Sequence, residues 1–255
     1  MSAPGDFDSL SGTAVTLDSV SPPQVWVLDE KLTEEYRKMS QGKVDRGGGP
    51  PFAAVKFTCH RASDPDQKGF MRLYIQIPVT GTLLAPAAVR AQQAVPQRTH
   101  GELEVLQNLA DQQCEAVPPL LGTCQRQQGD EECVPGGYVN CVAWARVAGE
   151  PIDEPSFFTK HDRQYRDEVR RVFRQTYLKL AKCGWQPMLL ELKKIIYDED
   201  TQEIIISLCK HIAGFRDFDP LDPSQQFTDV IYASWGLANI SPGPDWAQHS
   251  SDWEW

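Results

Sequence analysis

Residues 184–198 read Gly-Trp-Gln-Pro-Met-Leu-Leu-Glu-Leu-Lys-Lys-Ile-Ile-Tyr-Asp, and this stretch decides how the fold is interpreted. Before it, residues 163–182 carry apolar side chains at helical spacing, and Gly184 is a typical residue to end that helix. After it, the acidic turn 198–201 leads into the isoleucine-rich run 203–206. The order predicts a long helix followed by a hairpin.

The composition indicates a folded, acidic protein. Its 255 residues and 28.6 kDa suffice for one large domain or two lobes. Hydrophobic residues at 41% and charged residues at 24% are near globular averages, so we expect an ordered core. The net charge of -10 disfavours nucleic acid as a partner, because an acidic surface repels phosphates. The start is polar and no run reaches about 18 apolar residues, so we expect neither a secretory signal nor a membrane span.

The cysteines and histidines suggest no metal site. The seven cysteines are scattered and none forms a Cys-x-x-Cys pair, and the five histidines show no regular spacing. We therefore expect free, mostly buried thiols and a reducing, cytoplasmic location.

The pattern along the chain predicts an α+β fold with two lobes. A loose leader (1–22) precedes a first lobe (23–147), which is followed by a helical lobe with a hairpin (148–234) and a Trp- and Pro-rich tail (235–255). The tail is interpreted either as a docking segment or as a disordered end. In the first lobe we expect strands at 24–28, 52–59, 70–78, 120–121 and 137–144, helices at 30–39 and 99–114, a flexible loop at 42–51, a turn at 64–69 and a polar loop at 125–132. In the second we expect helix 163–182, with Arg166, Arg170, Arg171 and Lys179 opposite its apolar face, and strands 194–197 and 203–206.

Six segments carry a resemblance to a known superfamily. They are Ala-Val-Lys-Phe-Thr-Cys (54–59), Met-Arg-Leu-Tyr-Ile-Gln-Ile-Pro (71–78), Val-Pro-Gly-Gly-Tyr (134–138), Arg-Asp-Glu-Val-Arg (166–170), Ile-Ile-Tyr-Asp (195–198) and Ile-Ile-Ile-Ser-Leu (204–208). In this order they resemble the kinase-like superfamily, and within it a group of degenerate fungal proteins related to aminoglycoside phosphotransferases. The resemblance implies a two-lobed fold, with a small antiparallel sheet in the N-lobe and a mainly helical C-lobe.

The same resemblance shows where phosphotransferase chemistry is missing. Phosphoryl transfer needs a lysine on the phosphates, a catalytic Asp, and an Asn and an Asp that hold magnesium. The lysine strand offers Arg72 as its only cation, and the resemblance places Leu189 and Lys194 at the Asp and Asn positions and Ser207 at the second Asp. Gly-Gly-Gly at 47–49 runs directly into two prolines, as in a surface loop. We therefore predict no metal, no cofactor and no working kinase.

Two features near the strand that carries Arg72 have more than one interpretation. Glu102 either pairs with the strand cation or is a solvated helix charge, and the second interpretation is favoured. Arg72, Tyr74 and Gln76 alternate, so they share one face of a strand. That face either lines a cleft or meets solvent, with solvent favoured.

The leading hypothesis is a metal-free cyclase or isomerase, such as a Diels–Alder-type pericyclase, acting on an apolar fungal secondary metabolite. Such a reaction needs a shaped apolar pocket and a hydrogen-bond donor. The proposed donors are Gln76 and Arg146, and the substrate-binding candidates are Tyr74, Trp144 and Trp185, although each aromatic residue also suits plain packing. The alternative is a non-catalytic pseudokinase-like binding or scaffold protein that meets a protein partner through its tail. A small-molecule phosphotransferase is a distant third.

Overall fold

The computed structural model describes residues 7–188, 190–207, 215–219, 221–222, 225–240 and 243–255. The chain divides into two compact units, each with its own sheet and buried side chains. Unit 1 comprises residues 1–104 and 120–146, and unit 2 comprises residues 105–119 and 147–255. The predicted boundary between lobes at 147/148 is close to the observed one at 146/147, but a single cut did not anticipate that 105–119 belong to the second unit.

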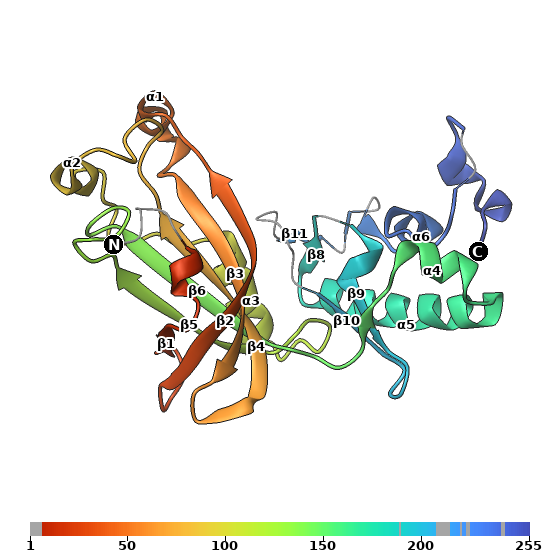
Figure 1. Ribbon diagram of the computed structural model, residues 1–255. Coiled ribbons are helices and arrows are strands. Elements are labelled where there is room, and N and C mark those ends of the chain that lie inside the picture. Colours follow the sequence, from red (N-terminus) through yellow and green to blue (C-terminus); the bar gives the residue numbers. More distant parts are fainter. Residues whose placement is uncertain (1–6, 189, 208–214, 220, 223–224, 241–242) are drawn as a thin grey trace. The chain divides into compact units, whose positions relative to one another are not determined.

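Unit 1 is built on one antiparallel sheet whose strand order is β1-β2-β3-β4-β6-β5 (Figure 1). Its two edges are joined beyond β1: the Ser19 N–H donates to the Thr123 carbonyl over 3.3 Å, and the Thr123 N–H donates to Ser19 Oγ over 2.7 Å. The sheet is therefore strongly curled. The strands are β1 (Ala14–Leu17), β2 (Gln24–Arg37), β3 (Phe52–Arg61), β4 (Asp64–Gln76), β5 (Leu120–Gln127) and β6 (Tyr138–Ala145).

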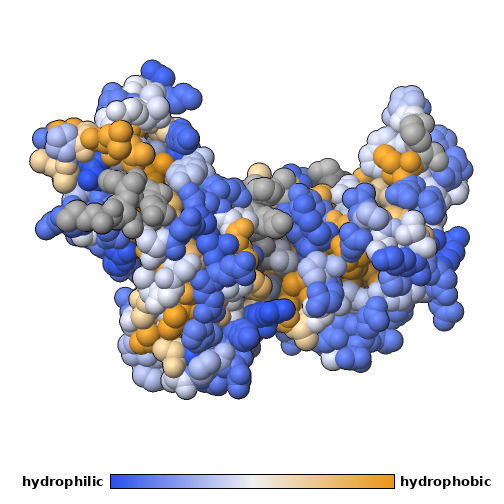
Figure 2. Space-filling model, viewed as in Figure 1, coloured by the Kyte–Doolittle hydropathy of each residue, from blue (hydrophilic) through white to orange (hydrophobic). Residues whose placement is uncertain are grey.

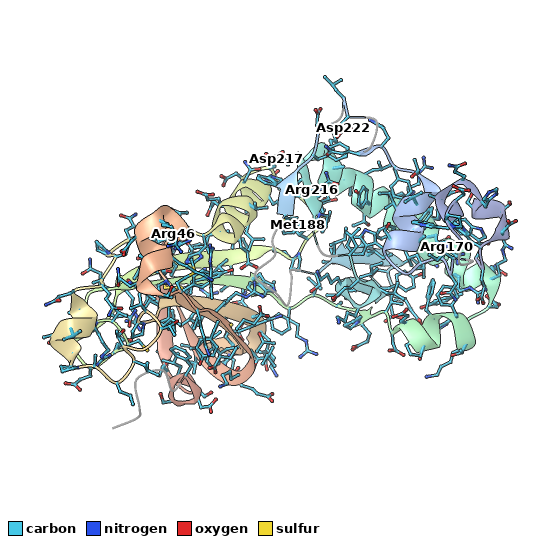
Figure 3. All side chains as sticks on the ribbon, turned by 90° about the horizontal axis from the view of Figure 1, so that it is seen from above. Arg46, Arg170, Met188, Arg216, Asp217 and Asp222 are labelled. Carbon is cyan, nitrogen blue, oxygen red and sulfur yellow. A yellow bond between two sulfur atoms is a disulfide. The ribbon has the colours of Figure 1, made fainter. Side chains whose placement is uncertain are left out.

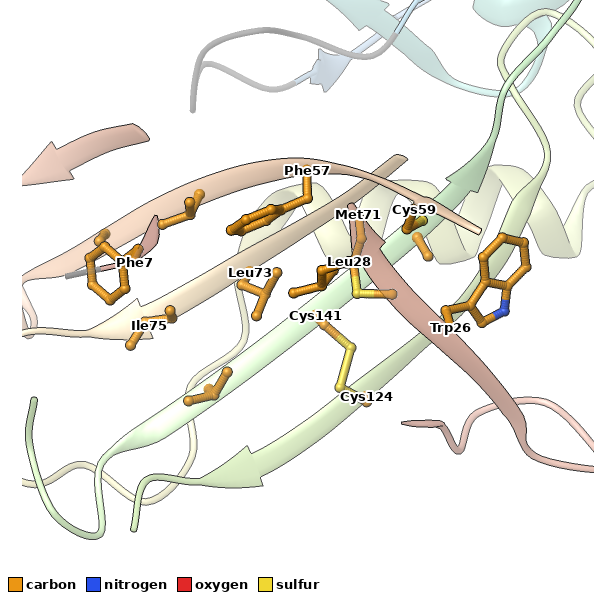
Figure 4. Packing of buried hydrophobic residues seen from close by; sticks show 14 of the residues in the cluster. Phe7, Trp26, Leu28, Phe57, Cys59, Met71, Leu73, Ile75, Cys124 and Cys141 are labelled. Carbon is orange, nitrogen blue, oxygen red and sulfur yellow. A yellow bond between two sulfur atoms is a disulfide. The ribbon is translucent and has the colours of Figure 1, made fainter. Parts of the chain in front are cut away.

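The core of unit 1 lies on one face of this sheet (Figure 4). Alternate residues of the central strands point into it, as the period of two along a strand requires. The large members include Trp26, Leu28, Phe57, Met71 and Leu73. Every other residue of β4, from Arg72 onwards, therefore lies on the opposite face.

A disulfide joins Cys124 of β5 to Cys141 of β6, whose Cα atoms are 5.0 Å apart. The expectation that all cysteines are free thiols is wrong for this pair. The two cysteines lie directly opposite each other in the register of β5 and β6, and spacing along the sequence does not reveal register. Cys59, Cys114, Cys133 and Cys183 are free among the described residues.

The N-terminal part of unit 1 differs from the prediction. The described part of the leader is ordered: a 3₁₀ turn (η1, Asp8–Leu10) precedes β1, and Phe7 and Leu17 are buried in the core. The predicted helix at 30–39 is instead the second half of β2. Register shifts around Lys31 interrupt the alternation of β2, so its apolar residues imitate helical spacing. The predicted loop at 42–51 contains α1 (Gln41–Lys43) and the single π-turn η2 (Val44–Gly48).

The remaining elements of unit 1 agree more closely. The predicted strands 52–59, 70–78 and 137–144 correspond to β3, β4 and β6, but the β3–β4 turn lies at 62–63 because Arg61 already pairs with Asp64. The strand β5 extends into the predicted polar loop. Two helices follow β4: the short α2 (Ala87–Ala91), and α3 (Gly101–Asp111), which lies within the predicted 99–114 and of which only residues 101–104 belong to unit 1.

Unit 2 is organised around α5 (Arg163–Lys182), whose bounds match the prediction. Asp162 caps it by accepting the Tyr165 N–H over 2.8 Å, and Gly184 follows with φ +83°. The buried face includes Val169, Phe173 and Leu180. Around it lie α4 (Glu154–Thr159), α6 (Asp229–Ser234), the sheet β10-β9-β7 (Glu203–Ile206, Ile195–Asp198, Glu150–Pro151), the pair β11-β8 (Phe215–Asp217, Trp185–Pro187) and the 3₁₀ turns η3 (Leu192–Lys194), η5 (Trp246–Gln248) and η6 (Ser250–Asp252).

The described part of the tail packs on α5. Trp235 and Trp253 are buried, and Asn239 pairs with Glu254 through two backbone hydrogen bonds. The tail also covers Arg166 and Arg170, so these two arginines, which the pattern places opposite the apolar face, are buried as well. The interpretation of the tail as a disordered end is wrong for its described residues, because their aromatic rings find partners in this unit.

The surfaces drawn in Figure 2 are mainly hydrophilic, with small hydrophobic patches on each unit. Within the described ranges, no helix combines the length and apolar character that crossing a bilayer requires.

Candidate functional site

A buried charged cluster lies on the non-core face of β4. Arg72 Nη1 donates to one carboxylate oxygen of Glu102, and the Tyr74 hydroxyl donates to the other. The side chains of Arg72 and Glu102 are only 2% and 6% exposed. Glu102 stands in the first turn of α3, and this turn covers the strand. The favoured interpretations of a solvated Glu102 and a solvent-facing strand are therefore wrong, because the sequence does not show which face the helix covers.

Burial and neighbouring charges determine the protonation states of Arg72 and Tyr74. Burial alone would lower the pKa of Arg72, but the charges of Glu102 and Tyr74 and the hydrogen bonds to both together outweigh burial, and the net pKa lies above the ordinary value. Burial and then the Glu102 charge raise the pKa of Tyr74 well above 10.0. At neutral pH Arg72 is thus a cation and Tyr74 a neutral hydrogen-bond donor. A buried pair of this kind depends on both partners, since removing one leaves an uncompensated charge.

An aromatic wall continues from Tyr74 along the same face. The ring of His100 stacks on Tyr74 with centroids 4.1 Å apart, and Phe52 meets His100 edge-on at 4.7 Å. Burial, followed by the charges of Arg98 and Arg37, lowers the pKa of His100 to about 3. Its Nε2 atom is buried and has no hydrogen-bond partner among the described residues. His100 is therefore a neutral stacking residue at physiological pH.

Trp144 closes the other end of this row. Its ring lies 5.6 Å from the Arg72 guanidinium carbon and 5.2 Å from Lys56 Nζ, and only 2% of the residue is exposed. Two cations at these distances form cation–π contacts with the ring. The structure thus brings Tyr74 and Trp144 together around Arg72, with the indole engaged by charged side chains of unit 1.

Gln76 and Arg146, the two predicted donors, differ in their surroundings. The Gln76 amide is buried, donating to the Gln93 carbonyl over 2.7 Å and accepting the Val95 N–H over 2.8 Å. It therefore holds residues 93–95 against the sheet. Arg146 is exposed at the end of unit 1, where its backbone N–H donates to the Lys68 carbonyl over 3.2 Å.

Trp185, the third aromatic candidate, belongs to unit 2. It begins β8 and is partly exposed, and its Nε1 donates to Asn108 Oδ1 over 2.8 Å. The predicted set is thus divided between the two units, with Tyr74, Gln76, Trp144 and Arg146 in the first.

The positions assigned to magnesium ligands meet at one end of the hairpin β9–β10. Ile195 pairs with Ile206, and the next residues outward are joined because the Ser207 N–H donates to the Lys194 carbonyl over 2.7 Å. Lys194 is buried. At the two positions that the resemblance assigns to Asn and Asp, the chain has a lysine and a serine, neither of which supplies the carboxylate that magnesium prefers. Leu189, at the catalytic Asp position, lies outside the described residues. No group of three or more His, Cys, Asp or Glu side chains in the described part of the chain is arranged to hold a metal ion.

Sequence reasoning missed several residues of the unit 1 cluster. His100, Phe52 and Lys56 were not singled out, although each contacts a predicted residue. The one available signal is alternation: Phe52, Ala54 and Lys56 share a face of β3, and this face neighbours that of Arg72 and Tyr74 in the register. Nothing in the sequence marks His100, which precedes α3.

Comparison with known proteins adds little. No protein-family model and no curated protein matches the chain. Among solved structures it is similar to vaccinia related kinase 3, with 11% identity and a TM-score of 0.37 over 84% of this chain and 57% of that one. It is also similar to a chain of the CAK complex of Chaetomium thermophilum bound to ATP-gamma-S, with 15% identity and a TM-score of 0.42 over 80% of this chain and 50% of that one. The chain thus spans about half the length of these structures, and TM-scores below 0.5 do not establish a shared fold.

Proposed function

We propose that this chain is a kinase-like protein that does not transfer phosphoryl groups and instead acts as a binding or scaffold protein. The observation that carries the proposal is the pair Lys194 and Ser207, which are adjacent at the hairpin where the resemblance requires two magnesium ligands. A lysine at one of these positions offers no oxygen ligand to a divalent cation, and a serine at the other supplies no carboxylate, whereas phosphoryl transfer needs an Asn and an Asp that hold magnesium.

The architecture of unit 1 supports the kinase-like half of the proposal. In protein kinases a lysine on the third strand pairs with a glutamate on the helix named αC. Counted from β2, β4 is the third strand, and it carries Arg72; α3 follows it and carries Glu102. The ion pair joins a strand and a helix in the same order. However, Arg72 is enclosed between Glu102, Tyr74 and Trp144, and a planar guanidinium does not substitute for a flexible lysine ammonium.

A thermal-shift measurement on the full chain tests the proposal. We expect ATP with magnesium to leave the melting temperature unchanged, because a ligand that does not bind the folded state cannot stabilise it. The double variant Lys194→Asn/Ser207→Asp supplies the missing ligands and should gain magnesium-dependent stabilisation by ATP. The matched control Lys194→Gln/Ser207→Ala removes the ammonium without adding a carboxylate and should not. Magnesium-dependent stabilisation of the unaltered protein by several degrees would overturn the proposal.

The metal-free cyclase remains the alternative. Its proposed donor Gln76 is engaged by two backbone groups, and the rings of Tyr74 and Trp144 are buried against charged and aromatic neighbours. These contacts weigh against substrate-binding roles for the three residues. Arg146 is the exposed member of the predicted donors, so an Arg146→Gln variant that keeps its fold but loses cyclisation of a candidate polyene substrate would favour the cyclase. The apolar substrate, the fungal setting and a partner protein at the tail remain predictions.

A further inference from the structure

An open cavity of about 400 Å³ lies along α5 in unit 2, and its lining residues include neither Lys194 nor Ser207. Its wall includes Asp167, Arg170, Arg171 and Arg174, which recur at the three- and four-residue spacing of one helix face. Tyr232 of α6 and Trp255 complete it. The volume is within the range of sites for small organic molecules.

The charge of the cavity wall opposes that of the whole protein. Three guanidinium groups and the Asp167 carboxylate line the cavity, and Glu168, which pairs with Arg171, is the second carboxylate beside them, in a chain whose net charge is -10. The cavity is therefore a local positive region. Small anions are attracted to it, whereas most of the surface repels them.

Arg170 is the buried part of this positive region, and Figure 3 marks its position in unit 2. Its Nε donates to the Leu237 carbonyl over 2.7 Å and its Nη1 donates to Asp167 Oδ1 over 2.7 Å. Its Nη2 is buried and has no hydrogen-bond partner among the described residues. Asp167 is half-exposed and is shared with Arg163, so it compensates the Arg170 charge only in part. Burying a cation that is incompletely paired is unfavourable, and an anion in the adjoining cavity would offset that cost.

Arg171 and Arg174 supply exposed guanidinium groups at the mouth. The Arg174 guanidinium carbon lies 5.5 Å from the Phe227 ring, and no ion pair of Arg174 is found among the described residues. Arg171 is paired with Glu168 on the surface, where exchange of one anion for another costs little. Guanidinium groups bind carboxylate and phosphate in a two-pronged geometry, which a cavity with two of them favours.

The rest of the wall is aromatic. Tyr232 and Trp255 meet edge-to-face with centroids 5.9 Å apart, and the Arg170 guanidinium carbon lies 5.2 Å from the Trp255 ring. Apolar surface beside a positive region favours a ligand that has both an anionic group and an apolar body. An inorganic ion would contact the guanidinium groups of such a wall and leave its aromatic rings without a partner.

We infer that the cavity on α5 is a binding site for a small organic anion, whose carboxylate or phosphate group meets Arg171 and Arg174 while its aromatic body lies against Tyr232 and Trp255. The inference depends on unit 2 alone and stands whether or not the protein transfers phosphoryl groups.

Calorimetric titration of the full chain with four probes tests the inference. Phenyl phosphate and benzoate combine an anionic group with a ring, inorganic phosphate has only the charge, and benzylamine has the ring with the opposite charge. We expect phenyl phosphate or benzoate to bind at least several-fold more tightly than inorganic phosphate, and benzylamine not to bind. Equal binding of phenyl phosphate and inorganic phosphate would contradict the aromatic part of the site, and absence of binding by both aromatic anions would overturn the inference.

A variant pair on the same helix locates the binding. Arg174→Gln should weaken binding of the tighter aromatic anion by about tenfold or more, the loss expected for a hydrogen bond to a charged group. Lys179→Gln makes the same charge change on α5 at an exposed residue that pairs with Glu115 and does not line the cavity, so binding should stay within about twofold. An equal loss in both variants would show a diffuse charge effect and overturn the site. Both residues are exposed, so folding should be retained.

Discussion

Arg72 and Glu102 show at the scale of single residues how a buried ion pair fixes local structure. Arg72 contacts Glu102 and lies over Trp144, while Tyr74 takes the second oxygen of Glu102. The sequence predicts the candidates, since Arg72 is the only cation in the predicted strand 70–78 and Glu102 lies on the next predicted helix. It does not predict their burial, which depends on how the first turn of α3 covers β4.

Removing one partner of this pair should be costly. Arg72→Ala and Glu102→Gln should each lower the free energy of unfolding by about 3–5 kcal/mol, because each leaves a buried group without its partner. The double variant Arg72→Met/Glu102→Leu replaces both by apolar groups of similar volume and should be more stable than either single variant. Urea denaturation followed by circular dichroism measures all three. Losses below about 1 kcal/mol in the single variants would show that the pair is solvated.

His100 gives the protein a pH dependence of known sign. Its pKa is lowered from 6.5 to about 3 in the folded state. Below pH 6.5 the unfolded chain binds a proton at this histidine and the folded one does not, so stability falls as the pH drops towards 3. His100→Phe keeps an aromatic ring against Tyr74 and removes the titration.

Between pH 7 and pH 5 the unaltered protein should lose about 2 kcal/mol more stability than the His100→Phe variant. Carboxyl groups titrate in both proteins, so their effects cancel in the difference. Parallel stability curves for the two proteins would mean that His100 is accessible to protons in the folded state.

At the scale of elements, the disulfide makes a prediction of its own. Cys124 and Cys141 are separated by 17 residues, and a cross-link across a loop of this size contributes about 3 kcal/mol by restricting the unfolded chain. The variant Cys124→Ser/Cys141→Ser should be destabilised by about this amount, and reductant should have little further effect on it. Thiol counting should give the same number for the unfolded, unreduced protein as for this variant, because the two cysteines that the variant lacks carry no free thiol in the unaltered protein. A full count of seven would refute the bond.

The disulfide also bears on the predicted cytoplasmic location. Structural disulfides are typical of oxidising compartments and rare in the cytosol. The cross-strand bond in β5 and β6 therefore weighs against that prediction. Four other cysteines among the described residues are free thiols, as expected from the sequence.

Elements with regular periodicity were predictable, and elements with interrupted periodicity were not. The helix α5 has an uninterrupted apolar face, an Asp cap and a terminal glycine, and its predicted bounds agree with the structure. The strand β2 contains register shifts that shift its apolar residues out of alternation, and this led to a false helix at 30–39. The burial of Arg166 and Arg170 was not predicted, because the tail that covers them is distant in the sequence.

At the scale of the whole molecule, each unit combines two segments that are separated in the sequence, so the division cannot be predicted by cutting the chain at one point. The helix α3 contributes Glu102 to unit 1, whereas its later residue Asn108 accepts the indole N–H of Trp185 in unit 2. A prediction that cuts the chain once, near residue 147, therefore assigns 105–119 to the wrong unit. The functional candidates were affected in the same way, since Trp185 and the residues around Arg72 belong to different units.

The structure also shows how charge is distributed over the surface, which the net charge alone does not. A net charge of -10 describes the average surface, but Arg170, Arg171 and Arg174 gather on one cavity of α5. The sequence shows these arginines as one face of a helix. It does not show that Tyr232 and Trp255 face them, because those residues come from distant parts of unit 2.

Metal binding in the presence of nucleotide tests the central claim most directly. Manganese is a paramagnetic substitute for magnesium with similar oxygen ligands, so electron paramagnetic resonance can count manganese ions that the protein immobilises when ATP is added. With Lys194 and Ser207 at the positions that the resemblance assigns to the magnesium ligands, we predict no nucleotide-dependent bound manganese in the unaltered protein, and bound manganese in Lys194→Asn/Ser207→Asp. One tightly bound manganese per unaltered chain, present only with ATP, would contradict the account.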